Sequence, residues 1–285
     1  MTPSGFAIDL GGTKTAAARI RNGKVVARLQ KPTDADAGWQ TQIDILSTML
    51  ADLGHRHGDP LGAAVAGRID AEGNWHAVNP ETLRAITAAP LQAALRERFG
   101  PGARAANDAA AAALAEARFG AGQNAHNFAY VTVSTGVGGG LILGGRLIDS
   151  TTGLAGHVGF MSSRLGTGEG GSGRVGTVES VAGGRALAAA AGLSTARAVF
   201  EHGGYDQVID RSAAAVATLI ADLTAVLGLD CVAIGGSIGL ATGYRERVLT
   251  HLDSEPALFR PCVLPASLDH DSGLIGALLI AIEDR

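Results

Sequence analysis

Two glycine-rich turns, each placed between two apolar runs, constrain this sequence more than any other feature. The first strand–turn–strand motif spans residues 6–20, with the turn Asp9-Leu-Gly-Gly-Thr-Lys14. The second spans residues 130–143, with the turn Ser134-Thr-Gly-Val-Gly-Gly-Gly140. A Walker loop or a dinucleotide fingerprint would instead lead from a strand into a helix. The repeated strand–turn–strand pattern predicts a duplicated β-hairpin, with one copy in each of two lobes.

Both turns carry groups that bind phosphate. Glycines let backbone N–H groups approach phosphate oxygens closely, and hydroxyl side chains add further donors. One such turn is compatible with a plain hairpin, but two favour a nucleotide gripped by both lobes. A third turn follows the apolar run 231–234 and begins a helix. The candidate phosphate-binding residues are Gly11, Gly12, Thr13, Lys14, Ser134, Thr135, Gly136, Gly138, Gly139, Gly235, Gly236 and Ser237.

Two aspartates are candidates for the chemistry. The Asp9 carboxylate would repel a phosphate, so we expect it to hold Mg²⁺ through water. Asp108 follows Asn107 at a predicted helix start, directly after the mostly apolar stretch 103–106. It is either a helix N-cap or, in a phosphotransferase, the base that accepts the proton of the attacking hydroxyl.

Short apolar strands alternate with amphipathic helices, which is typical of an α/β fold. We place the boundary between the lobes at Asn107, so that residues 1–106 form the first lobe and 107–270 the second. The glycine-rich stretch 153–176 contains no predicted element. The predicted strands cover 6–10, 15–20, 25–30, 61–66, 74–78, 130–133, 141–143 and 231–234. The predicted helices cover 39–53, 91–99, 107–120, 179–191, 206–227 and 272–282.

Composition excludes several classes of protein. The chain is 46% hydrophobic and 18% charged with a net charge of -4, which indicates a soluble globular protein and argues against nucleic-acid binding. It has no long apolar run that predicts a membrane span. The first strand begins so close to Met1 that we expect neither a signal peptide nor a preceding helix-turn-helix. Its two cysteines, Cys231 and Cys262, allow no disulfide framework. We therefore expect a cytoplasmic enzyme.

Five motifs occur in the order seen in the ROK family of sugar kinases, which the chain resembles over most of its length. They are Asp9-Leu-Gly-Gly-Thr-Lys14, Asn107-Asp108, Ser134-Thr-Gly-Val-Gly-Gly-Gly140, Gly156-His157 and Glu179-Ser-Val-Ala-Gly-Gly184. Within the family, the chain is similar to the bacterial N-acetylmannosamine kinases. The resemblance implies an actin-like or hexokinase-like fold, with two duplicated lobes around a cleft and a final helix at about 271–285 packing back on the first lobe.

The resemblance also implies roles for particular residues. Asp108 corresponds to the catalytic base. The sugar-binding positions are Gly67, Arg68, Asn79, Asn107, Asp108, His157 and Glu179. The implied cofactors are ATP and Mg²⁺, the implied reaction is phosphorylation of a sugar 6-hydroxyl in sialic acid breakdown, and the implied assembly is a homodimer.

Two positions depart from the family pattern. Most ROK kinases have a sugar-binding glutamate three residues before the loop histidine, where this chain has Leu154, as the N-acetylmannosamine subgroup does. The positions of three zinc-binding cysteines are Gly170, Ser172 and Thr177. Without thiolates we expect no structural zinc. We expect the loop to be held by backbone hydrogen bonds and by packing of Leu154, Val158, Phe160 and Val175, and to order fully only on sugar binding.

Three other functions compete with this interpretation. A ROK kinase for glucose or N-acetylglucosamine would share the same motifs. A non-catalytic sugar-sensing protein or repressor would share the fold, but Asp108 and the expected lack of a DNA-binding segment oppose it. An ATPase switch of the actin or chaperone type would share the phosphate turns but would need neither Asn107-Asp108 nor His157.

Overall fold

The computed structural model describes residues 2–79 and 82–283. The chain forms two compact units, and each is described by itself. Unit 1 comprises Met1–Ala115, Asp149–Ala155 and His270–Arg285, and unit 2 comprises Glu116–Ile148 and Gly156–Asp269. The first boundary between the units therefore lies after Ala115, whereas the sequence predicted it at Asn107. Helix α3 (Asp108–Phe119) begins in unit 1, where it packs so closely on α10 (Ser272–Ile282) that a Cβ added at Gly276 would meet the Ala111 carbonyl.

A five-stranded sheet in the order β3-β2-β1-β4-β7 forms the centre of unit 1. Its first three strands are antiparallel, and β1, β4 and β7 run parallel. All five residues of β4 are buried, which is typical of a parallel strand covered on both faces. The strands are β1 (Gly5–Leu10), β2 (Lys14–Arg21), β3 (Lys24–Pro32), β4 (Leu61–Val65) and β7 (Arg104–Asn107).

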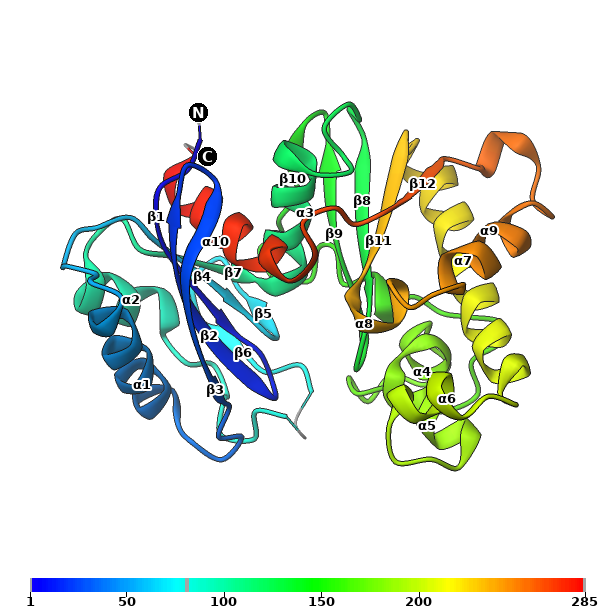
Figure 1. The fold of residues 1–285 in the computed structure, drawn as a ribbon, viewed down its shortest axis with the longest axis horizontal. Helices are drawn as coiled ribbons and strands as arrows, with labels where there is room; N and C mark the ends of the chain where they lie inside the picture. The colour runs from blue at the N-terminus through cyan, green and yellow to red at the C-terminus, as the bar shows by residue number, and fades with distance from the viewer. Residues whose placement is uncertain (1, 80–81, 284–285) are drawn as a thin grey trace. The chain divides into compact units, whose positions relative to one another are not determined.

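Helices cover both faces of this sheet. Helices α1 (Trp39–Asp52) and α2 (Leu91–Phe99) lie on one face, and α10 lies on the other (Figure 1). In α1 the buried residues Ile43, Leu46, Met49 and Leu50 recur at the helical period, so one stripe faces the strands. Helix α10 approaches β4 so closely that a Cβ at Gly62 would lie 1.8 Å from the Ala277 carbonyl oxygen. A side chain at Gly62 would therefore push α10 off the sheet.

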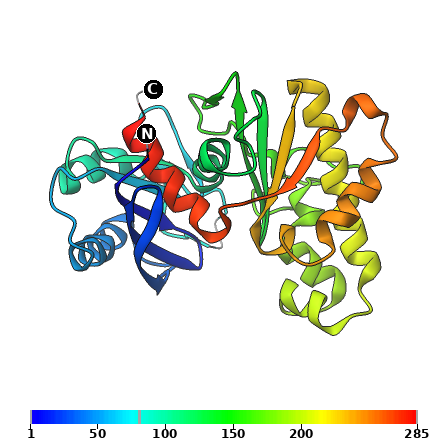
Figure 2. The same cartoon turned by 45° about the horizontal axis from the view of Figure 1, so that its top comes forward.

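Unit 2 repeats this arrangement with a sheet in the order β10-β9-β8-β11-β12. Strands β8 and β9 form the second antiparallel hairpin, and β8, β11 and β12 run parallel (Figure 2). The predicted α/β fold and duplicated hairpin are confirmed. The strands are β8 (Phe128–Val133), β9 (Val137–Leu143), β10 (Arg146–Leu147), β11 (Cys231–Gly235) and β12 (Cys262–Pro265).

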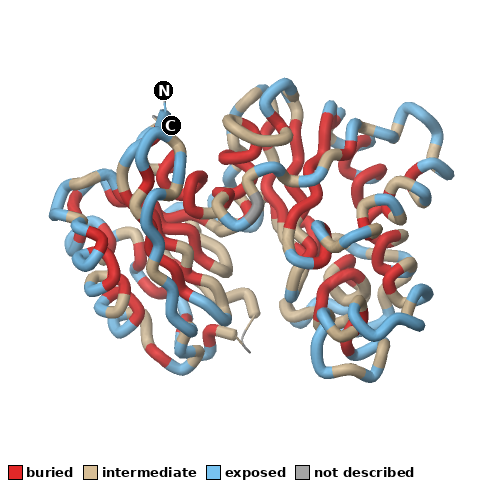
Figure 3. The backbone as a smooth tube through the Cα atoms, viewed as in Figure 1, coloured by how far each residue is buried: buried red, intermediate tan, exposed pale blue. Residues whose placement is uncertain are grey.

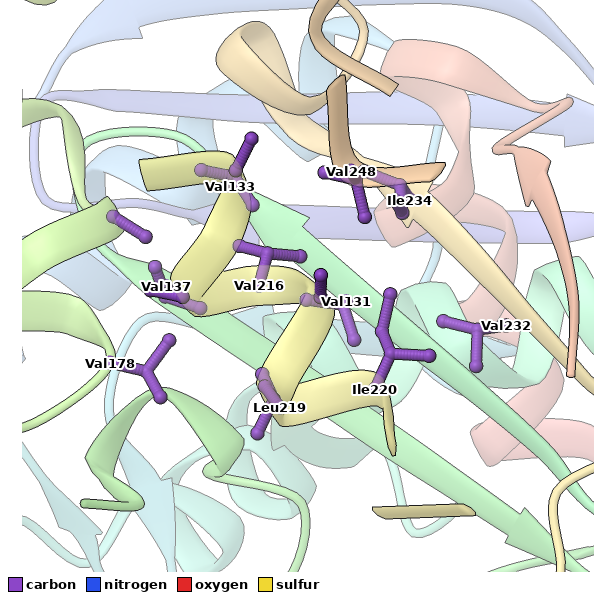
Figure 4. Packing of buried hydrophobic residues seen from close by; sticks show 14 of the residues in the cluster. Val131, Val133, Val137, Val178, Val216, Leu219, Ile220, Val232, Ile234 and Val248 are labelled. Carbon is purple, nitrogen blue, oxygen red and sulfur yellow. The ribbon is translucent and has the colours of Figure 1, made fainter. Parts of the chain in front are cut away.

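The core of unit 2 lies between its sheet and helices α7 (Asp206–Leu227) and α9 (Tyr244–Leu252). Val216 and Ile220 of α7 point toward the strand residues Val131 and Ile234 (Figure 4). These side chains are fully buried, and each contributes about 1.5–3 kcal/mol by leaving water. Figure 3 shows the burial along the backbone, with buried segments in the central strands and in the helix faces that pack on them.

The glycines and short elements account for most differences from the sequence predictions. The helix predicted over 179–191 is two helices, α4 (Glu179–Ala182) and α5 (Gly184–Ala191), because Gly183 is extended at ψ 149°. The strand predicted at 74–78 is limited to β6 (Trp75–His76), which pairs with β5 (Arg68–Ile69). Pro80, which follows the predicted strand 74–78 after Asn79, lies outside the described residues. The sequence reading missed α6 (Ala196–His202), α9 and β12.

The remaining elements are short. They are η1 (Val158–Phe160), α8 (Gly236–Gly239), η2 (Ala257–Phe259) and η3 (Asp269–Asp271). Across residues 2–79 and 82–283, none of the helices combines the length and the apolar character that a bilayer span requires.

Candidate active site

The first glycine turn is fixed by its own hydrogen bonds. The Gly11 N–H donates to the Lys14 carbonyl oxygen at 3.0 Å, and the Thr33 hydroxyl donates to the Gly11 carbonyl oxygen at 2.8 Å. Gly12 lies so near Thr82 that an added Cβ would come within 2.7 Å of its side chain. The chain therefore needs glycine here for close packing, and hydrogen bonds within unit 1 define the turn.

Sheet register brings Asp9 and Asp108 to the same edge of unit 1. Asp9 in β1 is opposite Ala64 in β4, which is opposite Ala106 in β7, and Asn107 and Asp108 follow directly. This edge is the carboxyl end of parallel strands, where α/β proteins place their ligands. The structure thus brings together two aspartates that are far apart in the sequence.

The two carboxyl groups hold protons more tightly than exposed aspartates do. Burial, followed by the nearby Asp108 charge, raises the pKa of Asp9 to about 7, although Arg28 acts in the opposite direction. Burial raises the pKa of Asp108 to about 6, against hydrogen bonds that favour its charged form. Perturbed acids of this kind gather at functional sites.

Asn107, and not Asp108, is the N-cap of helix α3. The Asn107 amide oxygen accepts the Ala110 N–H at 3.0 Å. Its amide nitrogen donates to the Gly67 carbonyl oxygen at 2.8 Å and to Asp108 Oδ1 at 3.0 Å. Asp108 Oδ1 also accepts the Ala109 N–H at 2.8 Å. The cap is Asn107, so Asp108 is oriented by the helix start without having to act as its cap.

Gly67 and Arg68 adjoin this edge. Gly67 has φ +111°, and a Cβ there would lie 2.3 Å from the His76 carbonyl oxygen, so only glycine fits. Arg68 donates to the Thr152 carbonyl oxygen at 2.6 Å, which fastens the segment 149–155 to β5. Leu154 in that segment is 48% exposed.

The β5–β6 hairpin is braced next to these residues. Asp70 Oδ2 lies 2.7 Å from His76 Nε2, and this hydrogen bond is the main cause that lowers the pKa of Asp70 to about 2. Asn79 follows this hairpin, and its carbonyl oxygen accepts the Thr82 N–H at 3.3 Å.

In unit 2 the second and third glycine turns adjoin each other. The Ser134 N–H donates to the Gly136 carbonyl oxygen at 2.9 Å and closes the second turn. The Ser134 hydroxyl lies 3.1 Å from the Ser237 hydroxyl in α8. A Cβ at Gly235 would come within 2.4 Å of the Tyr130 hydroxyl. The two turns therefore present their hydroxyl groups together, while Thr135, Gly138 and Gly139 follow along the same hairpin.

Glu179 links the second turn to the glycine-rich loop. Its carboxylate accepts the Val137 N–H at 3.1 Å and the Gly171 N–H at 3.0 Å. His157 precedes η1, and its ring stacks on Phe160 with centroids 5.6 Å apart. Glu179 therefore ties the second turn to the glycine-rich loop, and His157 packs against Phe160 of η1.

The comparisons identify the family to which this arrangement belongs. The model described as the ROK family matches residues 5–284. The chain belongs to the ROK family. It is 40% identical over 290 residues to an N-acetylmannosamine kinase of Escherichia coli O7:K1 (strain IAI39), covering 98% of this chain and 99% of the relative.

Solved ROK structures share the fold. The ROK hexokinase of Thermus thermophilus is 29% identical, with a TM-score of 0.80 and 97% of each chain covered. A ROK family glucokinase of Streptomyces griseus, solved with glucose and AMPPNP, is 24% identical with a TM-score of 0.80, covering 97% of this chain and 98% of that chain. The predicted ROK kinase fold is thus confirmed.

The loop of this ROK protein between Ser162 and Val178 is held by a side chain that the sequence reading missed. Arg174 donates to the Phe160 carbonyl oxygen at 2.9 Å and to the Ser162 hydroxyl at 3.1 Å. The backbone adds isolated bridges between Ser162 and Thr177 and between Glu169 and Val175. The only sign of this role in the sequence is that Arg174 is a long polar side chain within a glycine-rich segment.

Part of the predicted packing of this loop is wrong. Val158 is buried, but Leu154 is 48% and Val175 64% exposed. These two side chains therefore do not anchor the loop. The loop is anchored instead by the hydrogen bonds of Arg174 and Glu179, because a segment so rich in glycine offers few apolar side chains to pack.

The donor chemistry of the loop does not suit a structural zinc ion. Gly170 has no side chain, and the buried Thr177 hydroxyl accepts the Ser180 N–H at 3.2 Å. Glu179 is committed to two backbone N–H groups. Zinc in a structural site needs four strong ligands, with thiolates or imidazoles predominating. Within the described ranges, no cluster of three or more His, Cys, Asp or Glu side chains could hold a metal ion.

Proposed function

We propose that this ROK protein transfers the γ-phosphoryl group of ATP to the 6-hydroxyl of N-acetylmannosamine. One observation carries the catalytic part: an oriented, half-buried Asp108 beside Asp9 at the carboxyl edge of a parallel sheet. The relative from Escherichia coli, named an N-acetylmannosamine kinase and matched over nearly its whole length, supports the choice of sugar.

Asp108 acts as the base. Because the pKa of this carboxyl is about 6, it is largely ionised at pH 7 and still basic enough to accept the proton of a sugar hydroxyl. The hydrogen bonds from Asn107 and Ala109 fix one oxygen of the carboxylate, so that the group is aligned before the sugar binds.

Asp9 suits a magnesium ion. A carboxylate with its pKa raised to about 7 gains from any cation that offsets burial and the Asp108 charge, and Mg²⁺ prefers one or two carboxylates together with phosphate oxygens and water. Mg·ATP, when bound, supplies the phosphoryl group and neutralises its charge. The chain contributes the first turn, with Gly11, Gly12, Thr13 and Lys14, to hold the phosphates.

The second and third turns, in unit 2, are the other phosphate-binding segments of this proposal. Ser134 and Ser237 offer adjacent hydroxyl groups to a phosphate, and the glycines of both turns let it approach the backbone. The solved glucokinase with AMPPNP, an ATP analogue, supports the use of ATP by this fold.

Gly67, Arg68, Asn79, Asn107, His157 and Glu179 are the proposed sugar ligands. Leu154 favours N-acetylmannosamine over sugars that need a glutamate at this position. A hexose kinase for glucose or N-acetylglucosamine is the second candidate, favoured by the likeness to the hexokinase of Thermus thermophilus. We further propose that the enzyme is a cytoplasmic homodimer that acts in sialic acid breakdown.

A coupled assay of ADP release tests the choice of substrate. N-acetylmannosamine, N-acetylglucosamine, mannose and glucose are compared at equal concentrations with Mg·ATP. We expect the highest kcat/KM for N-acetylmannosamine, with strong discrimination wherever the wrong sugar leaves a buried polar group unpaired. A preference for glucose would favour the second candidate. No ADP release with any sugar, in a folded protein that binds N-acetylmannosamine, would favour the sugar-sensing function.

A further inference from the structure

A pocket in unit 1 lies at the opposite end of β1 from Asp9. Its volume is about 440 Å³, and its lining includes Gly5 and Phe6 at the start of β1, whereas Asp9 lies near the end of that strand. The other walls come from the end of β2 and from the turn between α1 and β4. A volume of this size is within the range of small-molecule sites.

Three arginines contribute to the lining of this pocket. Arg19 and Arg21 are two positions apart on β2, so their side chains leave the same face of the sheet, and Arg56 joins them from the turn after α1. Asp59 is the acidic residue in the lining. Its carboxylate accepts the Arg56 N–H at 2.9 Å, so this oxygen closes the turn. The lining therefore carries three positive charges and one negative charge.

None of the three guanidinium groups has a carboxylate within 4.0 Å among residues 2–79 and 82–283. Other arginines of unit 1 do: Arg28 pairs with Asp271, Arg84 with Asp36, and Arg98 with Asp44. The chain as a whole carries a net charge of -4, so a local excess of two positive charges is not a consequence of composition. Like charges around one hollow repel each other, and a bound anion removes that repulsion.

We propose that this pocket binds a phosphate dianion, either free or as the phosphoryl group of a small phosphate monoester. The net charge of the lining matches the two negative charges of such a group. Arginine suits it because the planar fork of N–H donors matches phosphate oxygens in pairs. The pocket is large enough to hold a sugar-sized body beside the phosphoryl group. This site is separate from the proposed kinase reaction and does not depend on it.

Calorimetric titration with inorganic phosphate tests the site. The titration is run at constant ionic strength, without sugar or nucleotide, on the wild type and on the single variants Arg19→Gln, Arg21→Gln and Arg56→Gln. We expect each variant to weaken phosphate binding by about 10-fold or more, the usual effect of losing a charge-assisted pair of hydrogen bonds. Arg98→Gln is the matched control, because it removes a paired arginine of the same unit, and we expect it to leave binding unchanged.

A second titration uses N-acetylmannosamine 6-phosphate. Tighter binding than inorganic phosphate, lost in the same three variants, would identify a phosphate monoester as the ligand, whereas equal binding would identify free phosphate. Equal affinity in the wild type and all three variants, or no binding at all, would overturn the proposal. Variants that lower the melting temperature without affecting phosphate binding would also overturn the proposal. The arginines would then only stabilise the fold, for example by interacting with the negative end of the α1 helix dipole. ADP release by the same variants should match the wild type.

Discussion

Asn107 donates a hydrogen bond of 3.0 Å to the Asp108 carboxylate while its own amide oxygen caps helix α3. One side chain therefore starts the helix and orients the proposed base. Its second amide hydrogen reaches the Gly67 carbonyl oxygen at 2.8 Å, so the base is also tied to the start of the β5–β6 hairpin.

Replacing Asp108 tests the base. We expect Asp108→Asn to lower kcat by about 100-fold or more, because the amide cannot accept a proton. The melting temperature at pH 7 should stay equal or rise slightly, since the raised pKa of Asp108 shows that its charged form is disfavoured in the folded chain. Fixed-time assays of ADP release measure kcat, and thermal denaturation measures the melting temperature. Near-normal kcat in the folded variant would remove Asp108 from the mechanism.

Replacing Asn107 separates capping from orientation. Asn107→Ala should lower the free energy of unfolding by about 0.5–2 kcal/mol through loss of the cap. It should also raise the pKa of Asp108, because a hydrogen bond to the charged form is lost, and so move the acid limb of the rate profile to higher pH. Asn107→Ser keeps a capping oxygen without adding a charge beside Asp108, and serves as the control for the loss of the cap. An unchanged acid limb in Asn107→Ala would show that its amide does not act on Asp108.

The pH dependence follows from the two raised pKa values. The rate should rise with pH through about 6 as Asp108 loses its proton. Stability should move the other way. The folded chain binds protons at Asp9 and Asp108 more tightly than the unfolded chain, so their contribution is complete below about pH 4 and is lost as pH rises to about 7. Denaturant unfolding of the wild type and Asp108→Asn at pH 4 to 8 checks this. A smaller pH effect is expected in the variant.

The glycine-rich loop should function without zinc. Elemental analysis of the purified protein should find far less than one zinc per chain, and chelators that spare Mg²⁺ should leave the rate unchanged. About one zinc per chain, lost together with activity, would show that the donor set has been misjudged.

Arg174 should help to anchor that loop through its hydrogen bonds to Phe160 and Ser162. Arg174→Gln loses the hydrogen bonds to Phe160 and Ser162, so limited proteolysis between residues 162 and 178 should become several-fold faster. KM for the sugar should rise more than kcat falls, because η1 follows His157 directly. Arg164→Gln, in the same loop, is the control. Equal cleavage rates in Arg174→Gln and the wild type would contradict the role of Arg174.

The sequence predicted the parts of this protein that local patterns encode. Apolar runs on both sides of glycine turns predicted the hairpins β1–β2 and β8–β9, and the apolar run 272–282 predicted α10 with the same bounds. The meeting of Asp9 with Asp108 depends on the register of three parallel strands, which follows from tertiary packing and not from local periodicity. The family resemblance, rather than the pattern, linked these two residues.

Two misreadings have a common physical cause. The helix predicted over 179–191 breaks because Gly183 is extended and the Gly184 N–H bonds to the Ser134 carbonyl oxygen in another element. Arg174 was overlooked because its hydrogen bonds cross the loop and follow no period in the sequence. In both cases one long-range contact outweighs local preference.

Nuclear magnetic resonance of the reaction product tests the central claim most directly. Purified protein is incubated with N-acetylmannosamine and Mg·ATP, and the phosphorus–carbon couplings of the product locate the new phosphate. The account predicts N-acetylmannosamine 6-phosphate formed in a one-to-one ratio with ADP, and none above background with Asp108→Asn in the same time. A phosphate on another carbon, or ADP formed without any phosphorylated sugar, would contradict it.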